Sequence, residues 1–177
     1  IVPTPTTDYQ TSTKKYVDDA KVGSTIQMVN YQTGAVSTTT AATPADDTLP
    51  QNTEGAEFMS LAITPAAAAN KLRVDVSDYV SHSVANAFIT VALFRDVTGS
   101  APATDACAVG ACNNVGTNTG AMVNFSYVVA AGSTAVNTFR VRIGGNTGAT
   151  LTFNGVGGAQ VMNGALASTI IISEVKG

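Results

Sequence analysis

The chain has 177 residues, a formal net charge of −3 at pH 7 and a hydrophobic content of 45%, which is enough to bury the core of one domain. Nine scattered Lys and Arg residues form no basic stripe of the kind that nucleic acid binding requires. The longest apolar run, residues 84–94, is far shorter than the roughly 20 residues of a membrane-spanning helix. We therefore expect no nucleic acid partner and no membrane insertion.

Charged residues make up only 12% of the chain, compared with about 25% in ordinary soluble domains. Ala, Thr, Gly, Ser and Asn occupy the positions that charged residues would normally fill. Such a surface is typical of subunits that bury part of it against other subunits. The first residue is Ile1 rather than Met, and we expect the chain to be part of a longer one.

Residues 1–23 differ in composition from all that follows. Pro3 and Pro5 predict an extended entry, and residues 8–21 predict a short helix that Thr11 or Ser12 can cap and Gly23 ends. An isolated helix needs roughly 12–15 residues even to be marginally stable, so this one needs a partner, most simply copies of itself. The residues expected to form its oligomerisation surface are Tyr16, Val17 and Ala20.

Residues 24–177 alternate polar and apolar side chains in short runs separated by Gly, Pro and Asn, which predicts β-strands. The clearest runs place Leu72, Val74 and Val76 in a core, and later Phe139, Val141 and Ile143 opposite two arginines. Residues 96–120 are expected to be a long loop. Strands are expected at residues 25–32, 57–63, 71–76, 87–95, 122–129, 136–143, 150–154 and 167–175, with a possible edge strand at 36–40.

This spacing of roughly eight to ten short strands, including the edge strand, predicts an all-β, jelly-roll-like antiparallel sandwich. The run Ile170-Ile171-Ile172 indicates a strand that is covered on both faces, which requires a second sheet or a neighbouring subunit. The sequence thus predicts two parts: an extended segment with a short helix at residues 1–23, and a sandwich domain at residues 24–177.

The two cysteines, Cys107 and Cys112, fall inside the expected 96–120 loop. They can form a disulfide that fixes the loop in an oxidising environment, or remain two unpaired thiols. A tetrahedral metal site would need further Cys or His ligands, and the chain has a single histidine. We expect neither a metal nor another cofactor.

The residues for catalysis are also missing from the sequence. The single histidine, His82, has Ser81 and Ser83 as neighbours, but adjacent residues of a strand point to opposite faces and do not form a nucleophile–base pair. We expect His82 to be a surface residue or a hydrogen-bonded polar one. Sugar-cleaving clefts pair two carboxylates and usually offer aromatic platforms, whereas this chain has no Trp and only 6% aromatic residues. We therefore expect no enzyme.

Three segments resemble bacteriophage tail-fibre and tail-spike receptor-binding proteins. Residues 12–18, Ser-Thr-Lys-Lys-Tyr-Val-Asp, are similar to a Thr-Lys-x-Tyr-Val-Asp helix found in those fibres, although many members have Ala in place of Ser12 or Thr13. Residues 63–74 are similar to a turn-and-strand unit, Ile-Thr-Pro followed by Asn-Lys-Leu-x-Val, of fibre tips. The C-terminal part resembles the ends of such proteins through residues 139–143, 150–155, Gly157-Gly158, Asn163-Gly164 and 167–174, the last run being Ala-Ser-Thr-Ile-Ile-Ile-Ser-Glu.

The resemblance implies a homotrimeric tip domain of a virion fibre or spike that attaches without catalysis to a glycan or envelope receptor of the host, alongside other virion proteins. Loops on a rigid sandwich usually carry such sites. The candidate receptor-binding residues are Asn113, Asn114, Asn118, Tyr79 and His82. Three alternatives remain open: a purely structural fibre or head-decoration domain, a capsular depolymerase, and a secreted trimeric jelly-roll ligand, which fits the fold but not the Tyr16-Val17-Asp18 segment.

Overall fold

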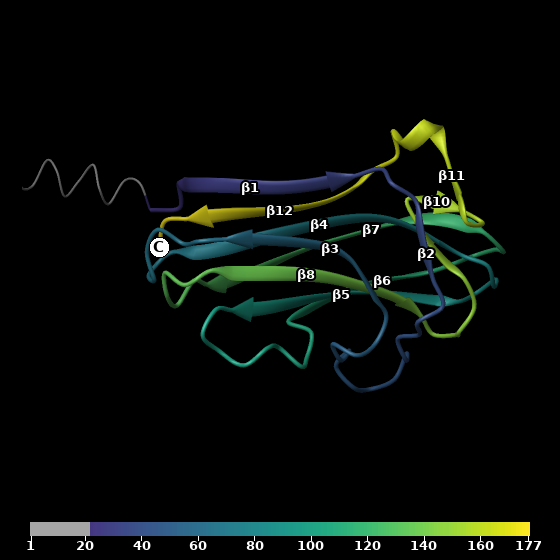
Figure 1. Cartoon of the computed structure of the whole chain (residues 1–177), viewed down its shortest axis with the longest axis horizontal. Helices are drawn as coiled ribbons and strands as arrows, with labels where there is room; N and C mark the ends of the chain where they lie inside the picture. Colours follow the sequence, from purple (N-terminus) through teal and green to yellow (C-terminus); the bar gives the residue numbers. More distant parts are fainter. Residues whose placement is uncertain (1–21) are drawn as a thin grey trace, which may run out of the picture.

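The computed structural model describes residues 22–177, which form a sandwich of two antiparallel sheets (Figure 1). The helix expected around Tyr16, Val17 and Ala20 lies outside the described residues. Within them, the only helical element is a 3-10 turn, η1 (Met162–Gly164).

The first sheet is built around β4 (Lys71–His82). One edge of β4 pairs along its whole length with β7 (Thr119–Ala130). The other edge pairs first with β12 (Ser168–Val175) and then, from Val80 onward, with β9 (Leu151–Phe153). The outer strands of this sheet are β1 (Thr25–Thr33) beside β12, and β2 (Ser37–Thr39) beside β9.

The second sheet has the order β3 (Ala56–Ile63), β8 (Asn137–Gly145), β5 (Phe88–Val97) and β6 (Ala108–Asn113). A separate hairpin consists of β10 (Gly155–Val156) and β11 (Ala159–Gln160). The chain passes repeatedly from one sheet to the other, with β3, β5 and β8 in the second sheet and β4, β7 and β12 in the first. This antiparallel double-sheet arrangement confirms the predicted jelly-roll-like fold.

The core lies between the two sheets and follows the predicted alternation. Leu72 and Val74 of β4 are completely buried, as are Phe139, Val141 and Ile143 of β8. In β12, the second sheet covers Ile170 and Ile172, whereas Ile171 lies on the outer face and is only half-buried. The sandwich therefore accounts for the burial of two of the three isoleucines and leaves the third facing outward.

The prediction of a long loop at residues 96–120 is wrong for its middle part. Residues 108–113 form β6 and pair with β5. Ala and Gly in this segment have low strand propensity, which hides the strand in the sequence. Gly110 is required there, since an added Cβ would lie 2.5 Å from Cδ1 of Phe125.

The two cysteines are free, so the disulfide alternative is wrong for this structure. Cys112 lies in β6, and the backbone N–H of Cys107, just before β6, donates to Leu93 O and extends the pairing with β5. Five residues of extended chain span about 16 Å, whereas a disulfide requires Cα atoms within roughly 7 Å. Burial raises the pKa of the Cys107 thiol to about 11, which keeps it protonated and unreactive.

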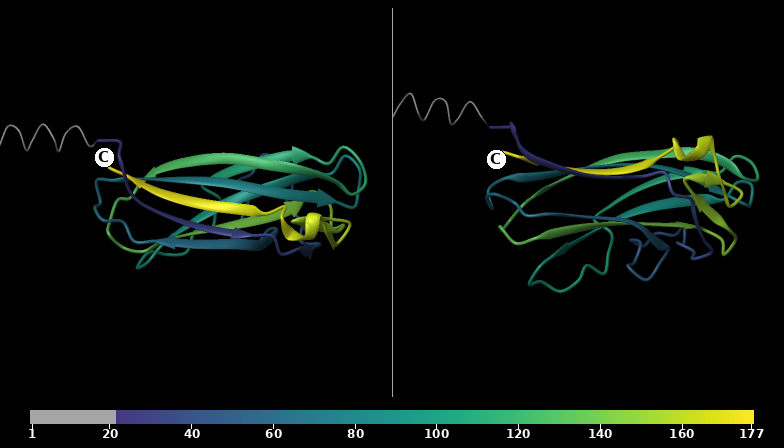
Figure 2. Two further views of the ribbon diagram at one scale, coloured as in Figure 1. Left: turned by 90° about the horizontal axis from the view of Figure 1, so that it is seen from above. Right: turned by 45° about the horizontal axis from the view of Figure 1, so that its top comes forward.

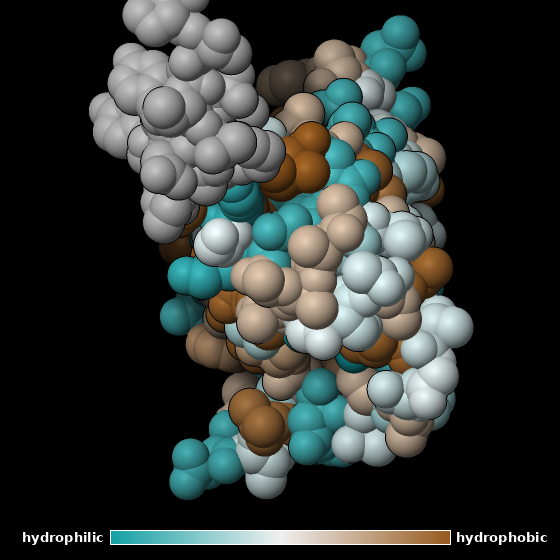
Figure 3. Space-filling view, turned by 90° about the vertical axis from the view of Figure 1, so that its left-hand side faces the viewer, coloured by the Kyte–Doolittle hydropathy of each residue, from teal (hydrophilic) through white to brown (hydrophobic). Residues whose placement is uncertain are grey.

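Both ends of the described chain lie at one end of the sandwich (Figures 1 and 2). There, the Gly23 N–H donates to Lys176 O and the Lys176 N–H donates to Ser24 O, each at 2.9 Å. Figure 3 views this end and shows hydrophobic residues scattered among polar ones. No helix in the described part of the chain is long and apolar enough to cross a membrane. We call the opposite end the distal end; it consists of residues 83–87, 114–118, 146–150 and 154–167.

Candidate binding site at the distal end

A buried asparagine connects the loop that follows β4 to the loop that follows β6 through side-chain hydrogen bonds. The side-chain amide of Asn114 donates to the carbonyl oxygens of His82, Val84 and Gly116 at 2.8, 2.8 and 2.6 Å. The backbone N–H of Asn118 donates to the same His82 carbonyl at 2.8 Å. One side chain therefore fixes the positions of residues 83–87 and 114–118 relative to each other.

The imidazole of His82 lies beneath these loops and is completely buried. Its Nδ1 accepts a hydrogen bond from the Val84 N–H at 3.1 Å, and its Nε2 lies 3.5 Å from Oγ1 of Thr147. Burial lowers the pKa of His82, so the ring is neutral at pH 7 and its Nδ1 is free to accept. Gly145 makes room for the ring, because a Cβ there would lie 2.5 Å from Nε2.

These positions correct the expectation that His82 and Asn114 face a receptor, since neither is accessible: His82 is 0% and Asn114 1% exposed. His82 is instead a hydrogen-bonded polar residue, the other reading of it from the sequence. Asn113 is exposed, and Asn118 is half-buried at the end of the β6–β7 loop. Tyr79 is half-buried on β4, where its phenol ring occupies the space that a side chain at position 120 would need. The structure therefore brings His82, Asn114 and Asn118 together and leaves Tyr79 apart from them.

A second buried asparagine supports the other side of the distal end. The Asn154 amide donates to Thr33 O at 2.7 Å, and its Oδ1 accepts from the Ser168 hydroxyl at 2.7 Å. Its backbone N–H donates to Tyr79 O at 2.9 Å. This residue joins the end of β1, the start of β12 and the middle of β4, and so anchors the loops that lead into and out of the β10–β11 hairpin.

Left-handed backbone conformations are concentrated at the distal end. Among the described residues, the non-glycine positions with positive φ are Asn86, Asn118, Asn154, Met162 and Asn163, with φ between 51° and 60°. All five belong to the distal end. Left-handed backbone costs most L-residues roughly 1–2 kcal/mol but is tolerated well by Asn, which accounts for four of the five, and such residues cluster at binding and active sites. Of these five, sequence analysis named only Asn118 as a site candidate; the density of Asn and Gly in these loops was the available signal for the other four.

The distal end carries no charge: its four segments contain no Asp, Glu, Lys or Arg. Its exposed side chains are amides, hydroxyls and three large apolar residues, namely Val84, Val115 and Met162, which are 41%, 79% and 76% exposed. No group of three His, Cys, Asp or Glu side chains that could hold a metal ion occurs among residues 22–177. The chemistry available here is hydrogen bonding between neutral groups together with apolar contact.

No family model matches the chain, and no curated protein matches it. Among solved structures, the Eiger TNF of S. frugiperda is 10% identical with a TM-score of 0.46, covering 84% of this chain and 92% of that one. The T=1 particle derived from infectious bursal virus is 15% identical with a TM-score of 0.45, and the match covers 86% of this chain but only 37% of the viral one. At these values the likenesses concern the fold alone and carry no argument about function.

Proposed function

We propose that this chain is the tip domain of a homotrimeric virion fibre or spike, and that its distal end attaches without catalysis to a saccharide of the host surface. The observation that carries the proposal is the contrast between the two ends. The chain enters and leaves at one end, whereas the opposite end presents uncharged loops held by buried Asn114 and Asn154. The fibre resemblance of residues 12–18 and of the C-terminal segments supports the virion assignment.

The composition of the distal end favours an uncharged ligand. Asn amides and Thr hydroxyls can exchange hydrogen bonds with sugar hydroxyls, and Val84, Val115 and Met162 can cover the apolar faces of sugar rings. Each site would be weak, and three of them on one trimer would raise the apparent affinity by orders of magnitude. Since no charged group takes part, binding should depend little on salt.

The non-catalytic part of the proposal rests on where the carboxylates lie. Glycoside hydrolysis requires two of them, about 5–10 Å apart, at the bound sugar, and the distal end contains none. Asp78, on β4, points into the core and is fully buried. Asp75 lies on the outer face of the first sheet, paired with Arg73.

The proposal is tested by binding of the purified full chain to an array of neutral and charged bacterial surface glycans at 50 and 500 mM NaCl, conditions that differ strongly in screening length (roughly 14 and 4 Å). We expect binding to neutral glycans that changes little with salt and is lost in Val115→Glu. Leu49→Glu is the matched control, because Leu49 is also exposed, at 57%, but lies in the loop before β3.

Three results would contradict the proposal. Absence of glycan binding, together with no inhibition of virion adsorption, would favour a purely structural domain. Release of oligosaccharides would show an enzyme. Equal loss of binding in both variants would place the binding surface away from the distal end.

A further inference from the structure

The outer faces of the two sheets are built differently. The outer face of the second sheet is covered by the loops at residues 40–55 and 98–107, which lie below it in Figure 1. Arg142 of β8 donates to Glu54 O and Gly55 O at 2.9 and 2.7 Å, and Phe94 packs against Ala106. No described loop crosses the outer face of the first sheet, as the view from above in Figure 2 shows.

This bare face carries large apolar side chains along both of its edges. On β1, Ile26 and Met28 are 46% and 61% exposed, and on β7, Met122 and Val128 are 43% and 57% exposed. The strand register places Met28 opposite Ser173, Val128 opposite Arg73 and Met122 opposite Tyr79, all of them on the side facing away from the core. Scattered apolar residues are normal on a protein surface, but these four gather along the borders of one uncovered face, and a concentration of exposed apolar side chains is what marks an interaction surface.

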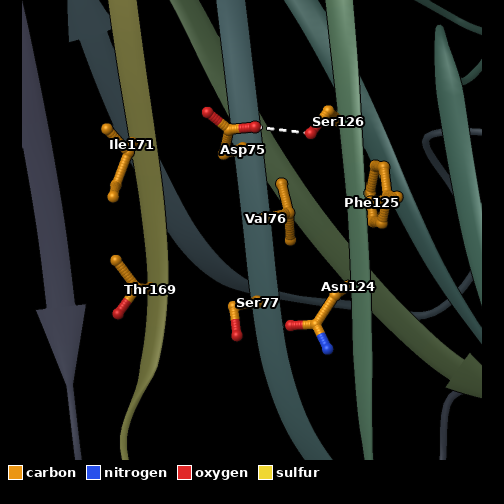
Figure 4. Close-up of a pocket in the computed structure, with 8 residues that line it drawn as sticks. All are labelled: Asp75, Val76, Ser77, Asn124, Phe125, Ser126, Thr169 and Ile171. Atoms are coloured by element: carbon orange, nitrogen blue, oxygen red, sulfur yellow. Dashed lines mark hydrogen bonds between the residues drawn. The ribbon is translucent and has the colours of Figure 1, made fainter.

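A shallow groove of about 340 Å³ runs between these edges (Figure 4). Its rim and floor come from three neighbouring strands, β12, β4 and β7. Apart from Asp75, its outward-facing side chains are uncharged. Those that line the groove are Asp75, Ser77, Asn124, Ser126, Thr169 and Ile171.

The charges near the centre of the face are already neutralised within the subunit. Nη2 of Arg73 lies 3.0 Å from Oδ1 of Asp75, which also accepts hydrogen bonds from Nε of Arg73 and from the Ser126 hydroxyl. Burying an unpaired charge in an interface costs free energy. Contact with a neutral partner would avoid this cost here, because Arg73 and Asp75 already pair with each other.

We propose that the partner that covers this face is a second copy of the same chain, with the apolar edge of one subunit lying along the groove of the next. This inference rests on the homotrimer of the proposed function and names its contact surface. Face-to-edge contacts are heterologous, and such contacts close into rings when the rotation between subunits allows it. The helix that the sequence predicts to self-associate, residues 8–21, directly precedes β1 in the chain, and β1 is one of these edges.

The size of the face agrees with this role. Four strands spaced about 4.8 Å apart and about eight residues long present roughly 500 Å². In one interface of a ring the face alone would therefore supply more than half of the ~800 Å² that each partner contributes to a stable interface.

Methionine oxidation tests the inference on the unmodified protein, because the chain has four Met residues in four different environments. Met59 is in the core at 2% exposure, and Met162 is at the distal end at 76%. In a separate subunit, Met28 and Met122 would be open to hydrogen peroxide as well. We expect peptide mass spectrometry to show Met28 and Met122 oxidised several-fold more slowly than Met162. Oxidation of all three at similar rates would overturn the inference.

A matched pair of variants provides the second test. Val128→Lys places a charge on the proposed interface, whereas Val109→Lys places the same charge on β6, where Val109 is 42% exposed on the outer face of the second sheet. Light scattering should give three chains of 17.9 kDa, or 53.7 kDa, for the wild type and Val109→Lys, and a smaller mass for Val128→Lys. A monomeric wild type, or dissociation of Val109→Lys instead of Val128→Lys, would overturn the inference. Neither measurement depends on receptor binding, so the glycan-binding proposal can fail without affecting them.

Discussion

Replacing Asp78 with Asn should stabilise the protein at neutral pH. Asp78 occupies an inward position of β4 between Val76 and Val80, and its carboxylate is completely buried with no hydrogen-bond partner for either oxygen. The nearby Ser168 hydroxyl already donates its proton to Asn154. Burial is the main cause that raises the pKa of Asp78 to about 7.

The magnitude and its pH dependence follow from the two pKa values. Below pH 3.8, Asp78 is neutral in both the folded and the unfolded chain, so its ionisation does not lower the free energy of unfolding. As the pH rises towards 7, only the unfolded chain ionises, so stability falls by a total of about 4 kcal/mol. Asn cannot ionise, but its amide would also be buried without partners. We therefore expect Asp78→Asn to raise the free energy of unfolding by about 1–3 kcal/mol at pH 8 and by about zero at pH 3.5.

Urea unfolding at pH 3.5, 6 and 8, at one fixed chain concentration, measures this difference. Asp47→Asn is the control, since it removes the same charge from an exposed loop and should change stability by less than about 0.5 kcal/mol at every pH. If Asp78→Asn were destabilising at pH 8, or if its effect were equal at all three pH values, the carboxylate would have a stabilising partner and the reasoning would be refuted.

Three further predictions concern other parts of the sandwich. Glu174 is buried, which by itself raises its pKa, but hydrogen bonds from two side-chain amides and the turn after β3 outweigh this and lower it. Glu174→Gln should therefore cost about 2–4 kcal/mol at pH 7, with the loss shrinking as the pH falls through the folded-state pKa below 4.5 in urea titrations. Gly145→Ala should lower the melting temperature by displacing His82, whereas Gly148→Ala, whose added Cβ would meet nothing closer than 3.9 Å, should not. Iodoacetamide at pH 8 should alkylate Cys107 far more slowly in the folded protein than in urea, and equal rates would contradict its raised pKa.

The alternation of side chains was enough to predict the fold class and most strands. Runs such as Leu72-Arg73-Val74-Asp75-Val76 have one buried and one exposed face, and a period of two is the direct consequence. β6 escaped prediction because its inward positions are taken by Ala108, Gly110 and Cys112, which do not contrast with their small, uncharged neighbours. In that segment the large side chain is supplied by the other sheet, where Phe125 fills the space over Gly110.

The candidate site was predicted less well, for a reason that lies in long-range contacts. The sequence drew attention to the Asn-rich loop after β6, and Asn113, Asn114 and Asn118 do lie at or beside the distal end. It could not show that Asn114 turns inward to bond three carbonyl groups, one at the end of β4 and one in the loop after it. Similarly, His82 is buried because Gly145, far away in the sequence, leaves space for its ring.

The two ends of the sandwich also differ in how well their buried polar groups are satisfied. Where the chain enters, Glu174 accepts hydrogen bonds from Gln27, Ala66, Ala67 and Asn70. Towards the distal end, Asp78 lacks any partner, and five non-glycine residues adopt left-handed conformations. The Asn114 and Asn154 amides hold the loops that contain these left-handed residues in place. The distal loops are therefore fixed by buried amides in left-handed turns that their Asn and Gly residues allow, which is the arrangement expected of a preorganised binding surface.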